Sequence, residues 1–123
     1  GEEYACRFIE EQGLEVLERN WRDSNRGELD ILAREGNTAV VVEVRTRVGI
    51  GYGSALESID TRKVLKLRRL AAQWARQRRL HSKLRIDIVA LTVPRACGQE
   101  LREGGTVDFL RYPPKIEWLR GIA

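Results

Sequence analysis

The sequence predicts an α/β domain with a mixed central sheet that opens with a three-stranded antiparallel meander and is flanked by helices. Residues 29–33 and 40–45 have the alternation and β-branched content of strands, and Gly36-Asn37 between them is a two-residue hairpin turn. Residues 61–79 have the apolar spacing of a long amphipathic helix. A further strand, 84–93, follows this helix, so the helix is a crossover and the strand should join the sheet in parallel.

The other segments complete one domain that spans residues 1–123, a length sufficient for a single core without disulfide bonds. A first helix is expected from Glu2 to Gln12, ending at Gly13. The remaining expected segments are the first strand of the meander (Leu14 to Arg22), its turn (23–27), a loop (Pro94 to Gly105) and two strand-like pieces (Val107 to Tyr112 and Ile116 to Leu119).

The hairpin turn fixes the register of the two strands that it joins, because it pairs Glu35 with Thr38. One face of the hairpin then carries only apolar side chains, and a slip by one residue would mix the two faces. The facing apolar pairs in this register are Leu29 with Val44, Ile31 with Val42 and Ala33 with Val40.

On the other face the same register places Asp30 opposite Glu43, and Glu28 opposite Arg45. Two carboxylates directly opposed across strands are destabilising, and a divalent cation would resolve the conflict. Magnesium is bound by one or two carboxylates with waters and a phosphate oxygen. The alternatives are a solvated acidic face for Asp30 and Glu43, and a plain cross-strand ion pair for Glu28 and Arg45.

Charge is unevenly distributed along the chain. Residues 61–86 hold ten basic side chains and no acid, so the rest of a chain whose total is +4 has a net charge of −6. This asymmetry is typical of a phosphate-binding surface beside an acidic metal site. The alternative is the solvated face of a helix, which Asp60 would cap.

The cysteine and histidine content and the apolar segments limit which metal sites and which cell compartment suit the chain. Cys6 and Cys97 are far apart and His81 is the single histidine, which argues against a structural zinc site and suits a reducing cytoplasm. No apolar run approaches the length of a membrane helix, and the opening residues do not resemble a signal peptide. We therefore expect a cytoplasmic protein without a membrane partner.

Several motifs in combination resemble the YraN-type family of uncharacterised bacterial proteins, within the PD-(D/E)XK, restriction-endonuclease-like superfamily. The resemblance covers nearly the whole chain, although each motif alone is weak. The matching stretches are Gly1-Glu2-Glu3-Tyr4-Ala5, Asn20-Trp21-Arg22, Gly27-Glu28-Leu29-Asp30, Val42-Glu43-Val44-Arg45-Thr46-Arg47, Tyr52-Gly53-Ser54-Ala55 and Arg85-Ile86-Asp87.

The resemblance implies a restriction-endonuclease-like fold and a magnesium or manganese site. Its metal ligands would be Asp30, Glu43 and the backbone carbonyl of Val44, with Glu28 or Glu2 completing the site. For Glu2 the alternative is an acid that only complements the dipole of the first helix. The catalytic residues would be Asp30, Glu43 and Arg45. Arg45 replaces the signature lysine of the superfamily; it cannot lose a proton, but it can orient water or neutralise developing charge.

The resemblance also implies phosphate contacts, for which the candidates are Arg47, Lys63, Arg62 and Lys66, beside a glycine-rich stretch at 48–54. Asp87 has two interpretations. It contacts the residues that bind the metal and orients them, or it forms a buried ion pair with an arginine. Trp74 is expected in the core.

The leading function is a metal-dependent nuclease acting on DNA, branched and single-stranded forms included, and a homodimer would suit a four-way junction. The alternatives are a nucleic-acid-binding module without catalysis and a protein-interaction adaptor.

Overall fold

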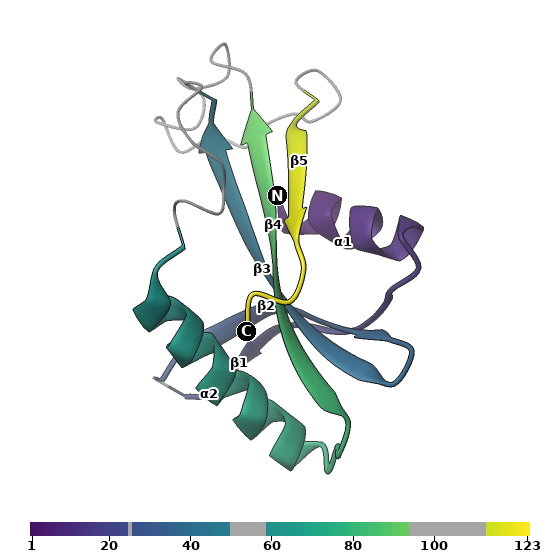
Figure 1. Ribbon diagram of the computed structural model, residues 1–123, viewed down its shortest axis with the longest axis vertical. Helices are drawn as coiled ribbons and strands as arrows, with labels where there is room; N and C mark the ends of the chain where they lie inside the picture. Colours follow the sequence, from purple (N-terminus) through teal and green to yellow (C-terminus); the bar gives the residue numbers. More distant parts are fainter. Residues whose placement is uncertain (25, 50–58, 94–112) are drawn as a thin grey trace.

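The computed structural model describes residues 1–24, 26–49, 59–93 and 113–123. Five strands form one sheet in the spatial order β1-β2-β3-β4-β5, and two helices accompany it (Figure 1). The elements are α1 (Glu2–Glu11), β1 (Glu15–Arg22), β2 (Glu28–Glu35), β3 (Thr38–Val48), α2 (Thr61–Gln77), β4 (Lys83–Val93) and β5 (Lys115–Leu119). The expected loop at 94–105, the strand-like piece at 107–112 and most of the glycine-rich stretch lie outside the described residues.

The sheet is mixed, as predicted. β1, β2 and β3 form the antiparallel meander, β4 joins β3 in parallel after α2, and β5 is antiparallel to β4. The strand predicted at Ile116–Leu119 is therefore present as β5. The crossover through α2 is what allows two neighbouring strands to run in the same direction.

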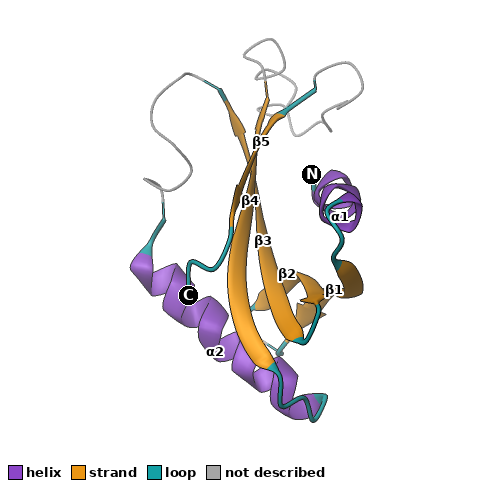
Figure 2. Cartoon of the chain, turned by 45° about the vertical axis from the view of Figure 1, so that its right-hand side comes forward, coloured by secondary structure: helices purple, strands orange, loops and turns teal. Residues whose placement is uncertain are grey.

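The two helices cover opposite faces of the sheet (Figure 2). On the α2 side, Leu32, Val41 and Ile86 pack against Leu70 and Trp74. On the α1 side, Ile31, Val42 and Val89 pack against Ala5 and Ile9. Because β3 is buried on both faces, its apolar residues run continuously from 39 to 42, which is the usual pattern of a strand between two layers.

Both helices begin as the sequence predicts. The carboxylate of Asp60 accepts from the backbone N–H of Arg62 at 2.9 Å, capping α2. Trp74 is in the core, and its indole N–H donates to Glu18 of β1 at 2.7 Å. α1 ends at Glu11, one residue before the expected end, and Gln12 is its exposed C-cap.

The hairpin has the predicted register, but its faces differ from the prediction. The observed pairs include Glu35 with Thr38, Ala33 with Val40 and Ile31 with Val42. Leu29, however, belongs to the core on the α2 side, together with its partner Trp21 in β1. Asn20 lies between Trp21 and the preceding paired residue Arg19, and its φ of +52° interrupts the alternation of β1. Leu29 and Trp21 therefore change face together, and neither side of the hairpin is a polar surface.

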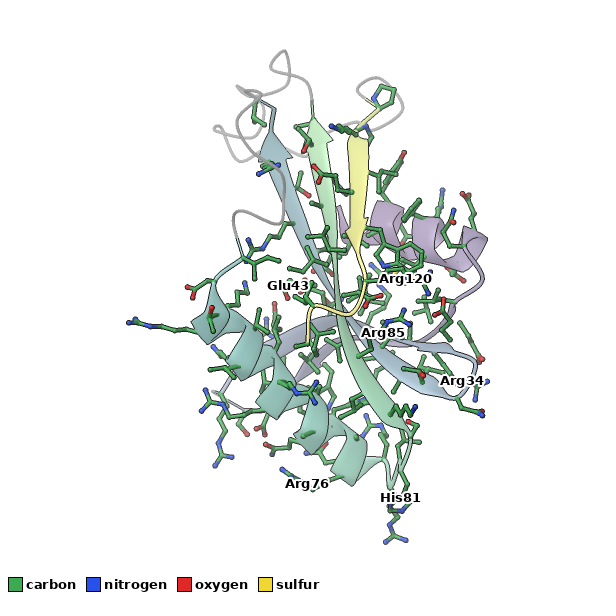
Figure 3. The ribbon with its side chains drawn as sticks, in the orientation of Figure 1. Arg34, Glu43, Arg76, His81, Arg85 and Arg120 are labelled. Atoms are coloured by element: carbon green, nitrogen blue, oxygen red, sulfur yellow. The ribbon has the colours of Figure 1, made fainter. Side chains whose placement is uncertain are left out.

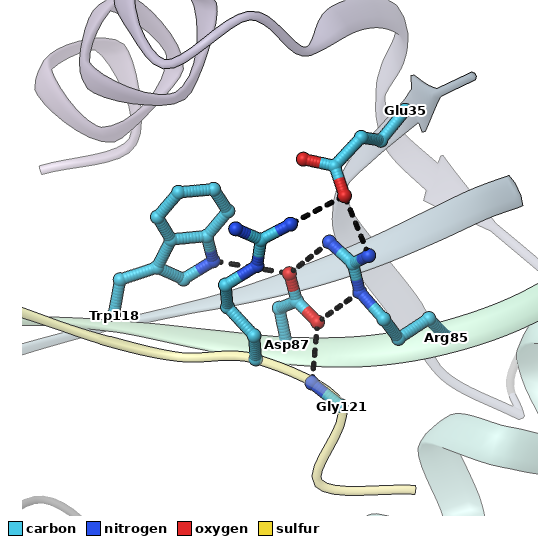
Figure 4. Close-up of polar contacts among 6 residues, drawn as sticks. Glu35, Arg85, Asp87, Trp118 and Gly121 are labelled. Carbon is cyan, nitrogen blue, oxygen red and sulfur yellow. Dashed lines mark hydrogen bonds and ion pairs between the residues drawn. The ribbon is translucent and has the colours of Figure 1, made fainter.

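The last residues of the chain are fixed to β4 by a buried polar network (Figure 4). The Asp87 carboxylate, 0% exposed, accepts from the Arg85 guanidinium at 2.9 and 3.0 Å. It also accepts from the indole of Trp118 at 3.0 Å and from the backbone N–H of Gly121 at 2.8 Å. Of the two interpretations of Asp87, the buried ion pair with an arginine is confirmed.

No helix in the described ranges is long and apolar enough to cross a membrane.

Candidate metal and phosphate site

The candidate site lies where β2 separates from β3. The ladder between these strands ends at Ile31 and Val42, one residue short of the predicted pair of Asp30 and Glu43. Asp30 continues the contact through its side chain, since its Oδ2 accepts from the backbone N–H of Val44 at 3.0 Å. The N–H and C=O of a strand residue leave the strand on the same edge, so the carbonyl of Val44 faces this gap as well.

Asp30 lies at the point where β2 changes which side chains face α1 and which face α2. Its neighbour Ile31 belongs to the α1 side, whereas Leu29 belongs to the α2 side. The half-buried Asp30 side chain therefore lies between the two faces. This position brings it near one acid from each layer, Glu2 of α1 and Glu43 of β3.

Glu43 is on the α2 side of β3 and is 8% exposed (Figure 3). Its Oε1 lies 2.9 Å from the ammonium nitrogen of Lys63 in the first turn of α2. Burial raises the pKa of Glu43, the hydrogen bond from Lys63 opposes this shift, and the charge of Asp30 adds to it. The net rise shows that Lys63 only partly compensates the ionised carboxylate.

Glu2 reaches Asp30 from the N-terminal turn of α1. Burial raises the pKa of Glu2, and the negative charge of Asp30 and a hydrogen bond to it raise it further. The resemblance placed Glu2 at the metal cluster, and the structure brings it into contact with Asp30. Two adjoining carboxylates repel each other when both are ionised, and a shared proton relieves this repulsion. A bound cation would relieve it in the same way.

A pocket of about 260 Å³ opens between the sheet and α2 at this point. Its walls carry three acids, Glu28, Asp30 and Glu43, and two lysines, Lys63 and Lys66. Gly27, Leu67 and Leu70 complete the lining. Carboxylates and ammonium groups in one pocket can hold a metal ion and the phosphate that the ion also contacts.

Glu28 does not face Arg45 in an ion pair. It is opposite Arg22 of β1 in the ladder, and its carboxylate lies 2.9 Å from the Arg22 guanidinium. Arg45 is half-buried, and its charge acts on Glu43 to lower the pKa of that group. Of the predicted catalytic trio, Asp30 and Glu43 therefore line one pocket, whereas Arg45 acts on Glu43 through its charge and is not part of the lining.

Two of the expected phosphate-binding residues lie away from the pocket lining. Arg47 is further along β3, where its guanidinium approaches Thr92 of β4 at 3.5 Å and Glu117 of β5 at 3.8 Å. Arg62 is exposed and does not line the pocket. Lys63 and Lys66 thus line the pocket, whereas Arg47 and Arg62 do not.

A second and larger pocket, of about 540 Å³, lies beside the first. It includes Arg69, Gln73 and Arg76 of α2, which were not among the predicted site residues. The signal in the sequence was their spacing with Lys66, which places all four along one flank of a helix.

Comparisons with known proteins agree with the motifs. The model of the uncharacterised protein family UPF0102 matches residues 1–91. The chain belongs to this family. It is 38% identical over 123 residues to a UPF0102 protein of Paenarthrobacter aurescens (strain TC1), covering 99% of this chain and 88% of the relative. A UPF0102 protein of Beutenbergia cavernae is 47% identical over 97 residues, which cover 78% of this chain and 81% of the relative.

The part of the chain that matches the UPF0102 family contains the whole candidate site. It extends from Gly1 to Leu91 in β4, and so includes both helices and the gap between β2 and β3. The YraN-type resemblance inferred from the motifs is thereby confirmed at the level of the family. The strand β5 and the final residues lie beyond the matched range.

Proposed function

We propose that this UPF0102 protein is a metal-dependent nuclease with a restriction-endonuclease-like fold, which hydrolyses phosphodiester bonds in DNA. The observation that carries the proposal is the gap between β2 and β3. Asp30, Glu43 and the Val44 backbone meet there, in a pocket that two lysines also line. A structural role alone does not account for this arrangement, because burial and the proximity of Asp30 both disfavour the charged form of Glu43.

The side chains at the gap fit magnesium or manganese. Among the described residues no group of three or more acidic, histidine or cysteine side chains is gathered closely enough to enclose an ion. Magnesium does not need such a cage, since it retains several waters and takes one or two carboxylates. Asp30, Glu43 and the carbonyl of Val44 would hold it, and Glu2 is the additional acid nearest to Asp30. When bound, the ion would polarise the scissile phosphate and lower the pKa of a coordinated water.

The basic residues of the chain have separate roles in this proposal. Lys63 pairs with Glu43 in the structure, and the same ammonium can contact a phosphate oxygen when Glu43 turns to a metal. Arg45 stays charged at any working pH, so it stabilises the negative charge that develops on the phosphate and does not serve as a base. Lys66 extends the positive surface from the pocket along α2.

The test is cleavage of an end-labelled panel of DNA duplex, single strand, flap and four-way junction, with manganese or with EDTA. Asp30→Asn and Glu43→Gln keep the size and polarity of the two acids, and Arg68→Gln is a surface control on α2. We expect metal-dependent cleavage that falls about 100-fold or more in the two site variants and is unchanged in the control. Cleavage that persists in Asp30→Asn, or that needs no metal, would refute the proposal.

A second candidate is a nucleic-acid-binding module without catalysis. The arginine at position 45 favours it, because the signature lysine of the resembled superfamily is absent. The ion pair between Lys63 and Glu43 also favours it, because it already compensates part of the buried charge. This candidate predicts DNA binding with steep salt dependence and intact strands under every metal condition.

A further inference from the structure

The larger pocket is a cleft between α2 and the connection from β1 to β2. Three basic side chains of the helix, Lys66, Arg69 and Arg76, form one wall together with Gln73. Asp23 and Arg26 form the other wall. The pocket is therefore lined mainly by groups that donate hydrogen bonds to anions.

The donors on the helix wall are arranged in a row. Lys66, Arg69, Gln73 and Arg76 are three or four residues apart, so they occupy one flank of α2. Ten residues separate Lys66 from Arg76, which corresponds to about 15 Å along the helix axis. A row of this length suits several phosphates in succession, whereas a single small anion would need donors that converge on one point.

These cations are not neutralised by acids of the described chain. Many other arginines are paired, such as Arg78 with Glu18, Arg34 with Glu15 and Arg22 with Glu28. Across the described ranges, no ion pair joins Lys66, Arg69 or Arg76 to a carboxylate. Their positive charge therefore remains available to a ligand.

The row continues into the candidate metal site, because Lys66 and Leu70 line both pockets. We propose that this flank of α2 is the track of a nucleic-acid backbone, along which Lys66, Arg69, Gln73 and Arg76 bind the phosphates adjoining the one held at Asp30 and Glu43. The inference rests on the proposed function for the position of the scissile phosphate. It adds the direction in which the strand leaves the site, toward the C-terminal end of α2 where Arg76 lies (Figure 3).

Arg26 provides the contact from the opposite wall. Its guanidinium lies 3.9 Å from Oδ2 of Asp23, and both residues line the cleft. That Oδ2 is buried and accepts no hydrogen bond within the described residues. A backbone lying in the cleft would thus have cations on both sides, Arg26 on one and the row of α2 on the other.

Binding of fluorescent DNA oligonucleotides, single-stranded and duplex, tests the track in EDTA at several salt concentrations. The double variant Arg69→Gln/Arg76→Gln removes two cations from the row. The matched double variant Arg68→Gln/Arg79→Gln removes the same charge from positions that line neither pocket. We expect the salt slope to fall by about 1.4 for single strands or about 1.8 for duplex in the first variant only, because each lost phosphate contact contributes about 0.7 or 0.9.

Equal loss in the two double variants would overturn the track, because it would show an effect of net charge alone. Binding to vesicles rich in anionic lipid, with none to oligonucleotides, would overturn it as well. Combining each double variant with Asp30→Asn separates the two proposals, since the track requires the difference between the double variants to persist when this metal ligand is gone. Loss of binding in Arg69→Gln/Arg76→Gln without any metal-dependent cleavage by the unmodified protein would support the track and refute the nuclease.

Discussion

At the scale of single residues, the site depends on Gly27 as well as on its charged groups. Gly27 has a φ of +147°, and a Cβ there would lie 2.9 Å from Cδ1 of Leu70 and 3.0 Å from Cε of Lys66. Glycine thus lets the start of β2 approach α2 closely. A side chain at this position would enter the pocket that holds Asp30 and Glu43.

Gly27→Ala should therefore destabilise the protein through both backbone strain and packing. Strain at positive φ costs about 1–3 kcal/mol, and displacement of the buried Leu70 adds about 1 kcal/mol or more. Gly13→Ala is the control, since Gly13 has a φ of +99° and a Cβ at that position would have nothing within 4 Å. Urea unfolding should show the larger loss for Gly27→Ala; equal losses would contradict a packing role.

Glu35 makes a pH-dependent contribution that can be measured separately from the site. The hydrogen bond from Arg85 is the main cause that lowers the pKa of Glu35 below its ordinary 4.5, and the charge of Arg120 adds to it. The unfolded chain then takes up the proton first as the pH falls. The stability contributed by ionised Glu35 is therefore complete above about pH 5 and is lost as the pH falls through the lowered pKa.

Glu35→Gln should be less stable than the unmodified protein by about 1 kcal/mol at pH 7, and the difference should shrink toward pH 3. Urea unfolding at pH 7, 5, 4 and 3 measures the difference directly. Glu11→Gln, an exposed position at the end of α1, controls for the loss of one surface charge. A difference that stays constant over this range would show that the ion pairs of Glu35 do not stabilise the fold.

At the scale of elements, the strands, the meander and the parallel addition of β4 followed from the sequence, whereas the place of β5 and the faces of the strands did not. The turn at Gly36-Asn37 fixed the register of β2 and β3 locally, so this pairing was predictable. The change of face at Leu29 depends on Asn20 in a different strand, and no alternation within β2 reveals it. The prediction assumed one buried face, but α1 and α2 bury both.

The attachment of β5 to β4 depends on Asp87. Four hydrogen bonds converge on its carboxylate, from Arg85, Trp118 and Gly121. The backbone adds a second connection, since Ile86 donates to the carbonyl of Ala123 and accepts from the N–H of Ile122. Arg120 also stacks on the Trp118 ring at 4.5 Å.

Asp87→Ala should cost about 3–5 kcal/mol, because it removes the buried acceptor of the Trp118 indole and leaves the half-buried Arg85 guanidinium with Glu35 alone among the described acids. Trp118→Phe removes one donor and should cost about 1 kcal/mol. Hydrogen exchange should show loss of protection at 115–123 in both variants, graded in the same order. A loss below about 1 kcal/mol in Asp87→Ala would mean that the network does not hold the C-terminal segment.

At the scale of the whole molecule, the arrangement of charge explains which parts of the site were predictable. The acids at Asp30 and Glu43 were evident because each lies within a hairpin strand whose register is fixed by the turn. The contact of Lys63 with Glu43 was not, because it depends on how α2 lies across the sheet. Its predicted role as a phosphate contact remains a prediction, and the structure adds that the same lysine is near enough to compete with a cation for Glu43.

This competition leads to a prediction for the folded protein as a whole. A ligand that binds only the native state raises the melting temperature, and at ten times its Kd it contributes about 1.4 kcal/mol, or a few degrees for a domain of this size. We expect magnesium or manganese at 10 mM to produce such a rise relative to EDTA at matched ionic strength. Asp30→Asn should abolish the rise, because it removes a charged ligand and keeps an acceptor for the Val44 N–H.

Lys63→Met should increase the same response, since Glu43 then lacks its cation within the chain while the helix keeps a residue of similar length. The baseline stability of this variant in EDTA should fall, because it leaves a buried carboxylate uncompensated. The two effects have opposite signs, so thermal unfolding of the unmodified protein, Lys63→Met and Asp30→Asn with and without metal resolves them. An equal rise in all three proteins would place the metal elsewhere on the surface and would separate Lys63 from the metal site.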